Sequence, residues 1–173
     1  MRTSLVLTVI GDDRPGLVEQ LAALVLAAGA NWEESRMARL AGKFAGLLRV
    51  SVDVEGADAL AARLTRLDDE GLTVVIKRSV DTEPDAFHAC GLDLVGHDHP
   101  GIIRDISRVL AEHRVNIEEL ETEVTSAAMS GDALFRARAR LRMPSTMAVD
   151  ELRGMLEALG GDLMVEVTLG EGR

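Results

Sequence analysis

The sequence repeats itself once. Four loop residues recur in the same order 85 positions later: Gly11, Asp13, Pro15 and Gly16 return as Gly96, Asp98, Pro100 and Gly101. The agreement extends past the loop, because Asn31 follows Gly16 by 15 positions and Asn116 follows Gly101 by the same interval. This repetition predicts two copies of one structural unit rather than a single large domain.

Each copy has the same order of hydrophobic periodicities. The short apolar runs Leu5–Ile10 and Leu92–Val95 end at a Gly-containing turn, which is typical of buried strands. Apolar residues at helical spacing follow each loop, and then come an alternating strand pair, a second amphipathic helix and a last strand. The second helix is expected to carry Leu60, Leu64 and Leu67 in the first copy, and Leu152, Leu156 and Leu159 in the second. We therefore predict an α+β protein with two ferredoxin-like βαββαβ domains, each an antiparallel four-stranded sheet with two helices on one face.

The predicted boundaries follow from this order. The first domain is expected at residues 1–81, a polar linker at 82–87 and the second domain at 88–173. Within the strand pairs, the turns are expected at residues 41–43 and 130–132, and Gly29 is expected to end the first helix. Two such units side by side would extend the sheet and cover edge strands.

Composition and charge exclude several function classes. Acidic residues outnumber basic ones, 29 against 19, and the net charge of −10 disfavours direct contact with nucleic acid or anionic lipid. Three Phe, one Trp and no Tyr leave few aromatic groups for stacking on bases. The single cysteine excludes an intrachain disulfide, and the sequence shows neither a membrane span nor a signal peptide. We expect a cytoplasmic protein.

The repeated loops can bind an anion. Each loop joins the end of a strand to the start of a helix, where backbone amides lack partners and the helix dipole is positive. Gly16 lets a ligand approach the backbone, Asp13 can cap the helix or meet an ammonium group, and Asn31 offers both a donor and an acceptor. Together these groups suit a free amino acid. The alternative from the residues alone is ordinary turn and capping chemistry.

The same residues resemble a known family. Asp-Arg-Pro-Gly, a helix and then Gly-Ala-Asn-Trp, and later His-Pro-Gly, a helix and then Arg-Val-Asn-Ile, look like the ACT domain. That family is a βαββαβ module that binds amino acids and regulates metabolism. The resemblance covers about residues 3–80 and 88–170, and a chain of two such domains is similar to the glycine cleavage system transcriptional repressor group.

The resemblance implies a function and a set of ligand contacts. It implies a non-enzymatic, homo-oligomeric regulator without a cofactor, which binds a small amino acid such as glycine at an interface of modules or subunits and signals through a protein partner. The implied contacts are Asp12, Asp13, Gly16, Leu17 and Asn31 in the first copy, and His97, Asp98, Gly101, Ile102 and Asn116 in the second. Some family members instead have an amide where Asp13 and Asp98 stand, and a His where Gly11 and Gly96 stand.

Two other functions remain open. His97, Asp98 and His99 could serve a metal-dependent ferredoxin-like enzyme, although Asp12 and Arg14 occupy the corresponding histidine positions in the first copy and could not build the same site. Alternatively, the chain could be a purely structural dimerisation module, in which replacing the two asparagines changes only stability.

Several side chains are expected to be structural. Four alternating arginines share one strand face, and three alternating glutamates on the preceding strand should pair with them. These residues are Arg136, Arg138, Arg140 and Arg142, and Glu119, Glu121 and Glu123. Cys90 is expected to be a buried, unreactive thiol, and Trp32 is expected to be a packing residue.

Overall fold

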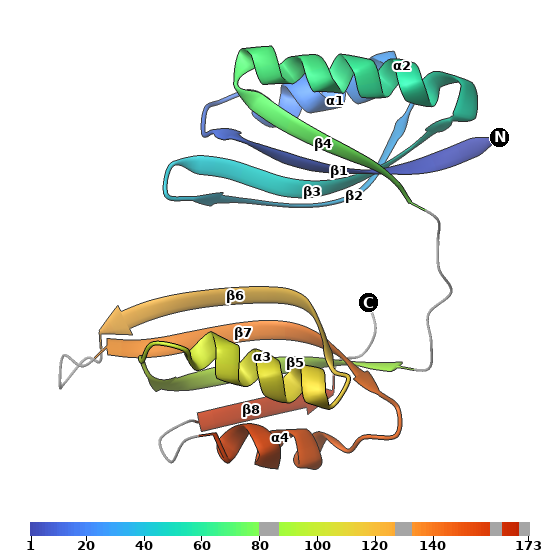
Figure 1. Ribbon diagram of the computed structural model, residues 1–173. Coiled ribbons are helices and arrows are strands. Elements are labelled where there is room, and N and C mark those ends of the chain that lie inside the picture. Colours follow the sequence, from blue (N-terminus) through green and yellow to red (C-terminus); the bar gives the residue numbers. More distant parts are fainter. Residues whose placement is uncertain (80–86, 127–132, 160–163, 170–173) are drawn as a thin grey trace. The chain divides into compact units, whose positions relative to one another are not determined.

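The chain forms two compact units, which are described separately. The computed structural model describes residues 1–79, 87–126, 133–159 and 164–169. The first unit spans Met1–Thr82 and the second spans Glu83–Arg173. Figure 1 shows the same succession of strands and helices in both units.

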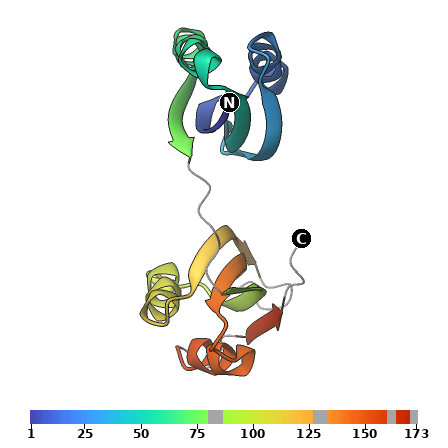
Figure 2. The ribbon, with the colours of Figure 1, turned by 90° about the vertical axis from the view of Figure 1, so that its right-hand side faces the viewer.

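The first domain is a four-stranded antiparallel sheet with helices on one face (Figure 2). Its elements are β1 (Arg2–Asp12), α1 (Leu17–Ala27), β2 (Asn31–Leu40), β3 (Lys43–Asp53), α2 (Val54–Thr65), a short 3-10 helix (Arg66–Glu70) and β4 (Leu72–Ser79). The strands lie in the order β2-β3-β1-β4. This is the predicted ferredoxin-like arrangement, with the 3-10 helix as an addition.

The second domain repeats the arrangement. Its elements are β5 (Phe87–His97), α3 (Ile102–Glu112), β6 (Asn116–Ser126), β7 (Ala133–Pro144), α4 (Val149–Glu157) and β8 (Met164–Leu169). The strands lie in the order β6-β7-β5-β8. β5 begins at Phe87, one residue inside the predicted linker. The predicted fold class is confirmed in both domains.

The predicted turns have different outcomes. In the first domain, Ala41 and Gly42 connect β2 to β3, and both have positive φ, 49° and 79°, so the expected turn is confirmed. The turn expected at residues 130–132 lies outside the described residues. α1 ends at Ala27, and Gly29 follows with φ 63°, a left-handed conformation that glycine adopts at low cost.

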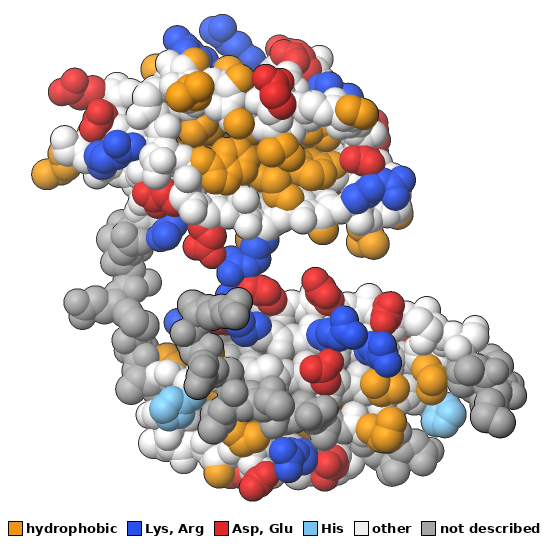
Figure 3. Space-filling view, turned by 180° about the vertical axis from the view of Figure 1, so that it is seen from behind, with side chains coloured by type: hydrophobic (Ala, Val, Ile, Leu, Met, Phe, Trp, Pro, Cys, Tyr) orange, Lys and Arg blue, Asp and Glu red, His pale blue; other side chains and the backbone are white. Residues whose placement is uncertain are grey.

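Each domain has a hydrophobic core of its own between sheet and helices. In β1 the alternate residues Leu5, Leu7 and Val9 are buried, because successive side chains on a strand point to opposite faces. They pack with leucines of both helices, and burying each such side chain contributes about 1.5–3 kcal/mol. Trp32 is partly buried against this core, as predicted. Hydrophobic side chains also gather on the side of the first domain that Figure 3 shows.

Two leucines expected in helices lie just outside them. Leu67 belongs to the 3-10 helix, and Leu159 follows the end of α4 at Glu157. Both still pack against their cores, so the apolar periodicity identified the right contacts and overestimated the helix lengths.

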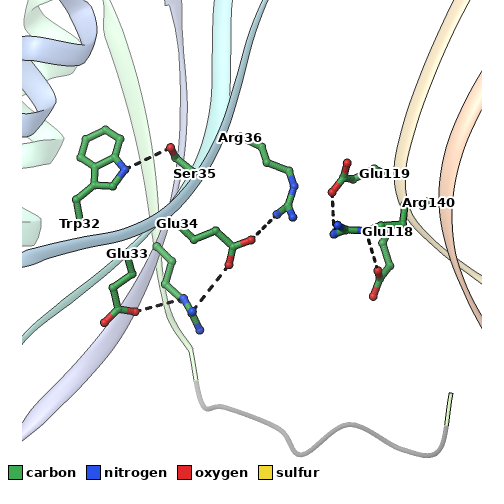
Figure 4. Close-up of polar contacts among 9 residues, drawn as sticks. Trp32, Glu33, Glu34, Ser35, Arg36, Glu118, Glu119 and Arg140 are labelled. Atoms are coloured by element: carbon green, nitrogen blue, oxygen red, sulfur yellow. Dashed lines mark hydrogen bonds and ion pairs between the residues drawn. The ribbon is translucent and has the colours of Figure 1, made fainter. Parts of the chain in front are cut away.

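The charged ladder of the second domain is confirmed. In the register of β6 and β7, Glu119, Glu121 and Glu123 lie opposite Arg140, Arg138 and Arg136. Arg140 lies between Glu118 and Glu119, with nitrogen-to-oxygen distances of 3.2 and 2.7 Å (Figure 4). Arg138 pairs with Asp93 of β5 at 3.3 Å. The sheet face that the helices leave free is therefore a solvated set of opposite charges in this domain.

Candidate amino-acid-binding loops

The start of the first helix in each domain carries no side-chain cap. Gly16 precedes α1 with φ 92°, and Gly101 precedes α3 with φ 95°; neither helix start has a side-chain capping hydrogen bond. The capping role predicted for Asp13 and Asp98 is therefore not observed. Glycine has no side chain to occupy the amide donors of the first turn, so these donors can bind an anion. The exception is the Ile102 N–H, which donates to the His99 carbonyl at 3.3 Å.

One backbone hydrogen bond fixes both loops in the same way. The Asp13 N–H donates to the Gly42 carbonyl at 3.0 Å, and the Asp98 N–H donates to the Ala133 carbonyl at the same distance. Each bond ties the loop to the neighbouring hairpin. The repeated loop sequence thus produces a repeated backbone path.

Basic side chains of the hairpin neutralise the first loop. The Asp13 carboxylate accepts a hydrogen bond from Arg39 Nε at 2.7 Å. The Asp12 carboxylate accepts one from Lys43 Nζ. This hydrogen bond, together with the charge of Lys43, lowers the pKa of Asp12 below its ordinary value of 3.8. Both carboxylates therefore already have cationic partners, and a ligand ammonium group would compete with them.

The second loop lacks these partners. In the strand registers, Val124 and Leu134 occupy the positions of Arg39 and Lys43. Among the described residues, no hydrogen-bond or ion-pair partner accompanies the Asp98 carboxylate, and the residue is exposed. The two loops share a backbone but differ in charge, which their common sequence motif does not reveal.

Sequence reasoning missed the partners of the first loop. Arg14 donates to Gln20 Oε1 at 3.2 Å, and Gln20 Nε2 in turn donates to Glu70, the last residue of the 3-10 helix. Arg39 and Lys43 lie near the turn predicted at residues 41–43, but only the register of this hairpin against β1 shows that they reach Asp13 and Asp12. The contact with Glu70 depends on tertiary packing and had no signal in the sequence.

Asn31 and Asn116 lie far from the loops of their own domains. On β3, Phe44 is opposite Gly11, whereas Ser51, seven residues farther along, is opposite Asn31. At about 3.3 Å per residue, this separates the loop from Asn31 by about 23 Å. The second domain has the same separation, since Gly96 is opposite Phe135 and Asn116 is opposite Arg142. Within one domain, therefore, the loop and the asparagine do not form one site.

The structure also describes the predicted buried cysteine and the histidines of the second loop. Cys90 is a buried free cysteine, as predicted, and burial raises the pKa of its thiol. His97, Asp98 and His99 are all exposed. In the described part of the chain, no group of three or more His, Cys, Asp or Glu residues is arranged to hold a metal ion. None of the described helices has the length and apolar composition that crossing a membrane requires.

Both halves of the chain match one family. Residues 3–77 and residues 92–137 each match a family model of the ACT domain. The chain belongs to the ACT-domain family. The duplicated fold, the uncapped helix starts and the repeated motif therefore all belong to two ACT domains in tandem.

Three relatives align with nearly the whole chain. The glycine cleavage system transcriptional repressor of Escherichia coli is 25% identical over 161 residues, which are 92% of this chain and 85% of the relative. A crystal structure of a protein of unknown function from Galdieria sulphuraria has a TM-score of 0.82 and 29% identity, and it covers 99% of this chain and 100% of its own. A crystal structure of a candidate glycine cleavage system transcriptional repressor has a TM-score of 0.73 and 20% identity, with 98% and 99% coverage.

Proposed function

We propose that this tandem ACT-domain protein is a non-enzymatic, cytoplasmic regulator that binds a small amino acid at its helix-start loops. The observation that carries the proposal is that the helix starts after Gly16 and Gly101 have no side-chain cap, in loops held to their hairpins by the same backbone hydrogen bond. A ligand carboxylate accepts hydrogen bonds from these amides and is stabilised by the helix dipole. The α-ammonium group then needs an acceptor close by.

The two loops differ in how well they supply this acceptor. In the second loop, Asp98 carries a carboxylate that no described side chain neutralises, beside the start of α3. In the first loop, the hydrogen bond from Arg39 occupies Asp13. The second loop is therefore the stronger amino-acid site. We expect glycine or another small amino acid, in line with the relative from Escherichia coli that is named for the glycine cleavage system.

Calorimetric titration with the individual amino acids tests this proposal. Asp98→Asn keeps the shape of the residue and removes the charge, so we expect it to weaken binding about 10–100-fold, the usual loss for a charge-assisted hydrogen bond. Asp13→Asn is the matched control, and it should change the affinity less than about threefold. Absence of binding across all twenty amino acids, at a range of concentrations, would contradict the proposal.

Asn31 and Asn116 join this proposal as residues of a neighbouring subunit. Each lies about 23 Å from the loop of its own domain, whereas a free amino acid is only a few ångströms long. If a second subunit supplies the asparagine, ligand binding and subunit association are linked, and each strengthens the other. Sedimentation velocity with and without the amino acid measures this linkage. Association that does not respond to a bound ligand removes the asparagines from the site.

The proposed output is regulation of transcription through a protein partner. The relative from Escherichia coli is named for repression of the glycine cleavage system. A net charge of −10 disfavours direct contact with DNA, which repels an acidic protein at long range. We therefore expect no shift of DNA by the purified protein alone. Affinity for the partner should depend on the bound amino acid, because a ligand acts as a switch only when it prefers one of two states.

A further inference from the structure

The two domains differ most on the sheet face opposite their helices. We call this face in the first domain its open face. It is formed by the side chains that alternate with the buried ones along the four strands. Its uncharged residues are Val6, Thr8 and Ile10 of β1, Ala45 and Leu47 of β3, Ala38 of β2, and Thr73 and Val75 of β4. Arg36 of β2 and Arg49 of β3 also lie on this face, in the rows of Leu47 and Val6, and both pair with Glu34.

Several of these positions are charged in the second domain. Leu47 lies opposite Thr8 in the first sheet, and Arg138 lies opposite Asp93 in the second. Likewise, the pair Ala38 and Ala45 corresponds to Glu123 and Arg136. The second domain therefore carries a solvated charge ladder on its sheet face, whereas the first domain has an uncharged centre formed by Ala38, Ala45, Leu47, Thr8, Ile10 and Val75, with Arg36 and Arg49 beside it.

The uncharged centre exposes large apolar side chains. Ile10, Leu47 and Val75 keep 49%, 53% and 51% of their surface exposed. They lie on three neighbouring strands, so they form one continuous patch. Contiguous exposed apolar surface on a folded domain usually marks an interaction site, whereas single exposed apolar residues do not.

We propose that the open face of the first domain binds the open face of a second copy of this protein, in a two-fold symmetric dimer. A two-fold axis parallel to the strands, between β3 and β1, places β3 over the partner's β1 and β2 over the partner's β4. Near the axis, cross-strand rows of the two sheets then face each other, as in aligned sheet packing.

The size of the side chains fits this arrangement. Leu47 and Thr8 share a cross-strand row, and so do Ile10 and Ala45. The two-fold axis therefore places Leu47 over the partner subunit's Thr8 and Ile10 over the partner subunit's Ala45. A large side chain faces a small one in both rows, which lets the two layers interdigitate.

The charges at the two edges also fit. Glu34 on β2 and Lys77 on β4 lie in one cross-strand row, through Arg49 and Val6, at opposite edges of the sheet. The same two-fold axis brings Glu34 over the partner subunit's Lys77 on both sides of the dimer. Opposite charges at the rim favour this register over other arrangements of the same faces.

The size of the face is sufficient for a dimer. Four strands about 4.8 Å apart and about eight residues long give a flat area of about 500 Å² per subunit. Two such faces bury about 1,000 Å² before the relief of the side chains is added, which reaches the lower limit for a specific interface. The dimer also buries the half-exposed side chains of Ile10, Leu47 and Val75 in each subunit, and this burial stabilises it through the hydrophobic effect.

The test is the mass of the full-length protein in solution, without amino acid, by sedimentation equilibrium. We expect a dimer, and Leu47→Glu should raise its dissociation constant at least ~30-fold, because it places a charge at the centre of the interface. Leu26→Glu is the matched control, since Leu26 is 78% exposed on α1, away from the open face, and should leave the dimer intact. Trp32 fluorescence verifies that each variant is folded.

The edge charges test the register. Glu34→Lys and Lys77→Glu should each weaken the dimer, and the double variant should restore it, because the exchanged charges attract again. A wild-type protein that stays monomeric at every concentration overturns the proposal, and so does a dimer that Leu47→Glu leaves unchanged. A double variant no stronger than the single ones overturns the two-fold register.

Discussion

Replacing Gly16 by alanine measures how strongly the helix-start loop depends on its backbone conformation. Gly16 has φ 92°, and a Cβ atom placed there meets no atom within 4 Å, so the cost is conformational rather than steric. A left-handed conformation costs a non-glycine residue about 1–2 kcal/mol. The lower entropy of the unfolded chain with alanine offsets about 0.4–1 kcal/mol of this cost. We expect a net destabilisation of about 0.8 kcal/mol, the difference between the middle values of these two ranges.

Urea unfolding monitored by Trp32 fluorescence measures this change. Trp32 is the only tryptophan and packs against the core of the first domain, so it reports on that domain. With a slope of about 1 kcal/mol per molar urea, the midpoint should fall by about 0.8 M. Gly101→Ala, the corresponding change in the second domain, should leave the Trp32 transition in place.

A second glycine of the same domain provides a control, because its replacement by alanine should raise the stability of the domain rather than lower it. Gly56 lies in α2, and a Cβ atom there meets only Val52 Cγ2, at 3.5 Å, an ordinary contact. Gly56→Ala should therefore stabilise the first domain by about 0.5–1 kcal/mol, through helix propensity. If Gly16→Ala stabilises the domain as much as Gly56→Ala does, residue 16 does not hold a left-handed conformation in solution, and the start of α1 does not have the geometry described above.

Three further changes test other parts of the structure. Lys43→Met should raise the pKa of Asp12 towards 3.8, because the variant loses the hydrogen bond and the positive charge that lower this pKa. In the unchanged protein the ion pair is present above the lowered pKa and is lost as the pH falls through it. NMR of the side-chain carboxyl measures the pKa, and an unchanged value would refute the pairing. Cys90 should react with a thiol reagent at neutral pH only after unfolding, since burial raises its pKa and blocks access; rapid reaction of the folded protein would contradict this. Leu152→Ala, at a position that is 0% exposed, should cost about 2–5 kcal/mol in the second domain, measured by calorimetry, without moving the Trp32 transition.

The fold could be predicted from the sequence because two independent signals agree. The loop motif is repeated, and the apolar periodicity changes from strand to helix at the same places in both copies. The predicted charge ladder is also correct, since alternation on a strand fixes which side chains share a face. The limits of α2 and α4 were less certain, because apolar residues such as Leu67 and Leu159 continue the helical spacing beyond the helix ends.

The candidate site could be predicted only in part. The loops lie where the sequence placed them, but Asn31 lies at the other end of the sheet. The eleven residues of α1 already imply this separation, because a helix of that length spans about 16 Å, and residues on either side of it cannot reach one small ligand. The ion pair between Asp13 and Arg39 needed the hairpin register, which the sequence motif does not contain.

The shared hydrogen bond between loop and hairpin has a consequence for how such a duplicated protein can diversify. Main-chain atoms form the bonds that hold the two loops, from Asp13 N to Gly42 O and from Asp98 N to Ala133 O. Neighbouring side chains can therefore change without removing these bonds. Replacing Arg39 and Lys43 by the valine and leucine of the other copy would remove the positive charges beside the first loop and leave its backbone hydrogen bond in place. The two helix-start loops of one polypeptide can thus acquire different charges while their backbone stays the same.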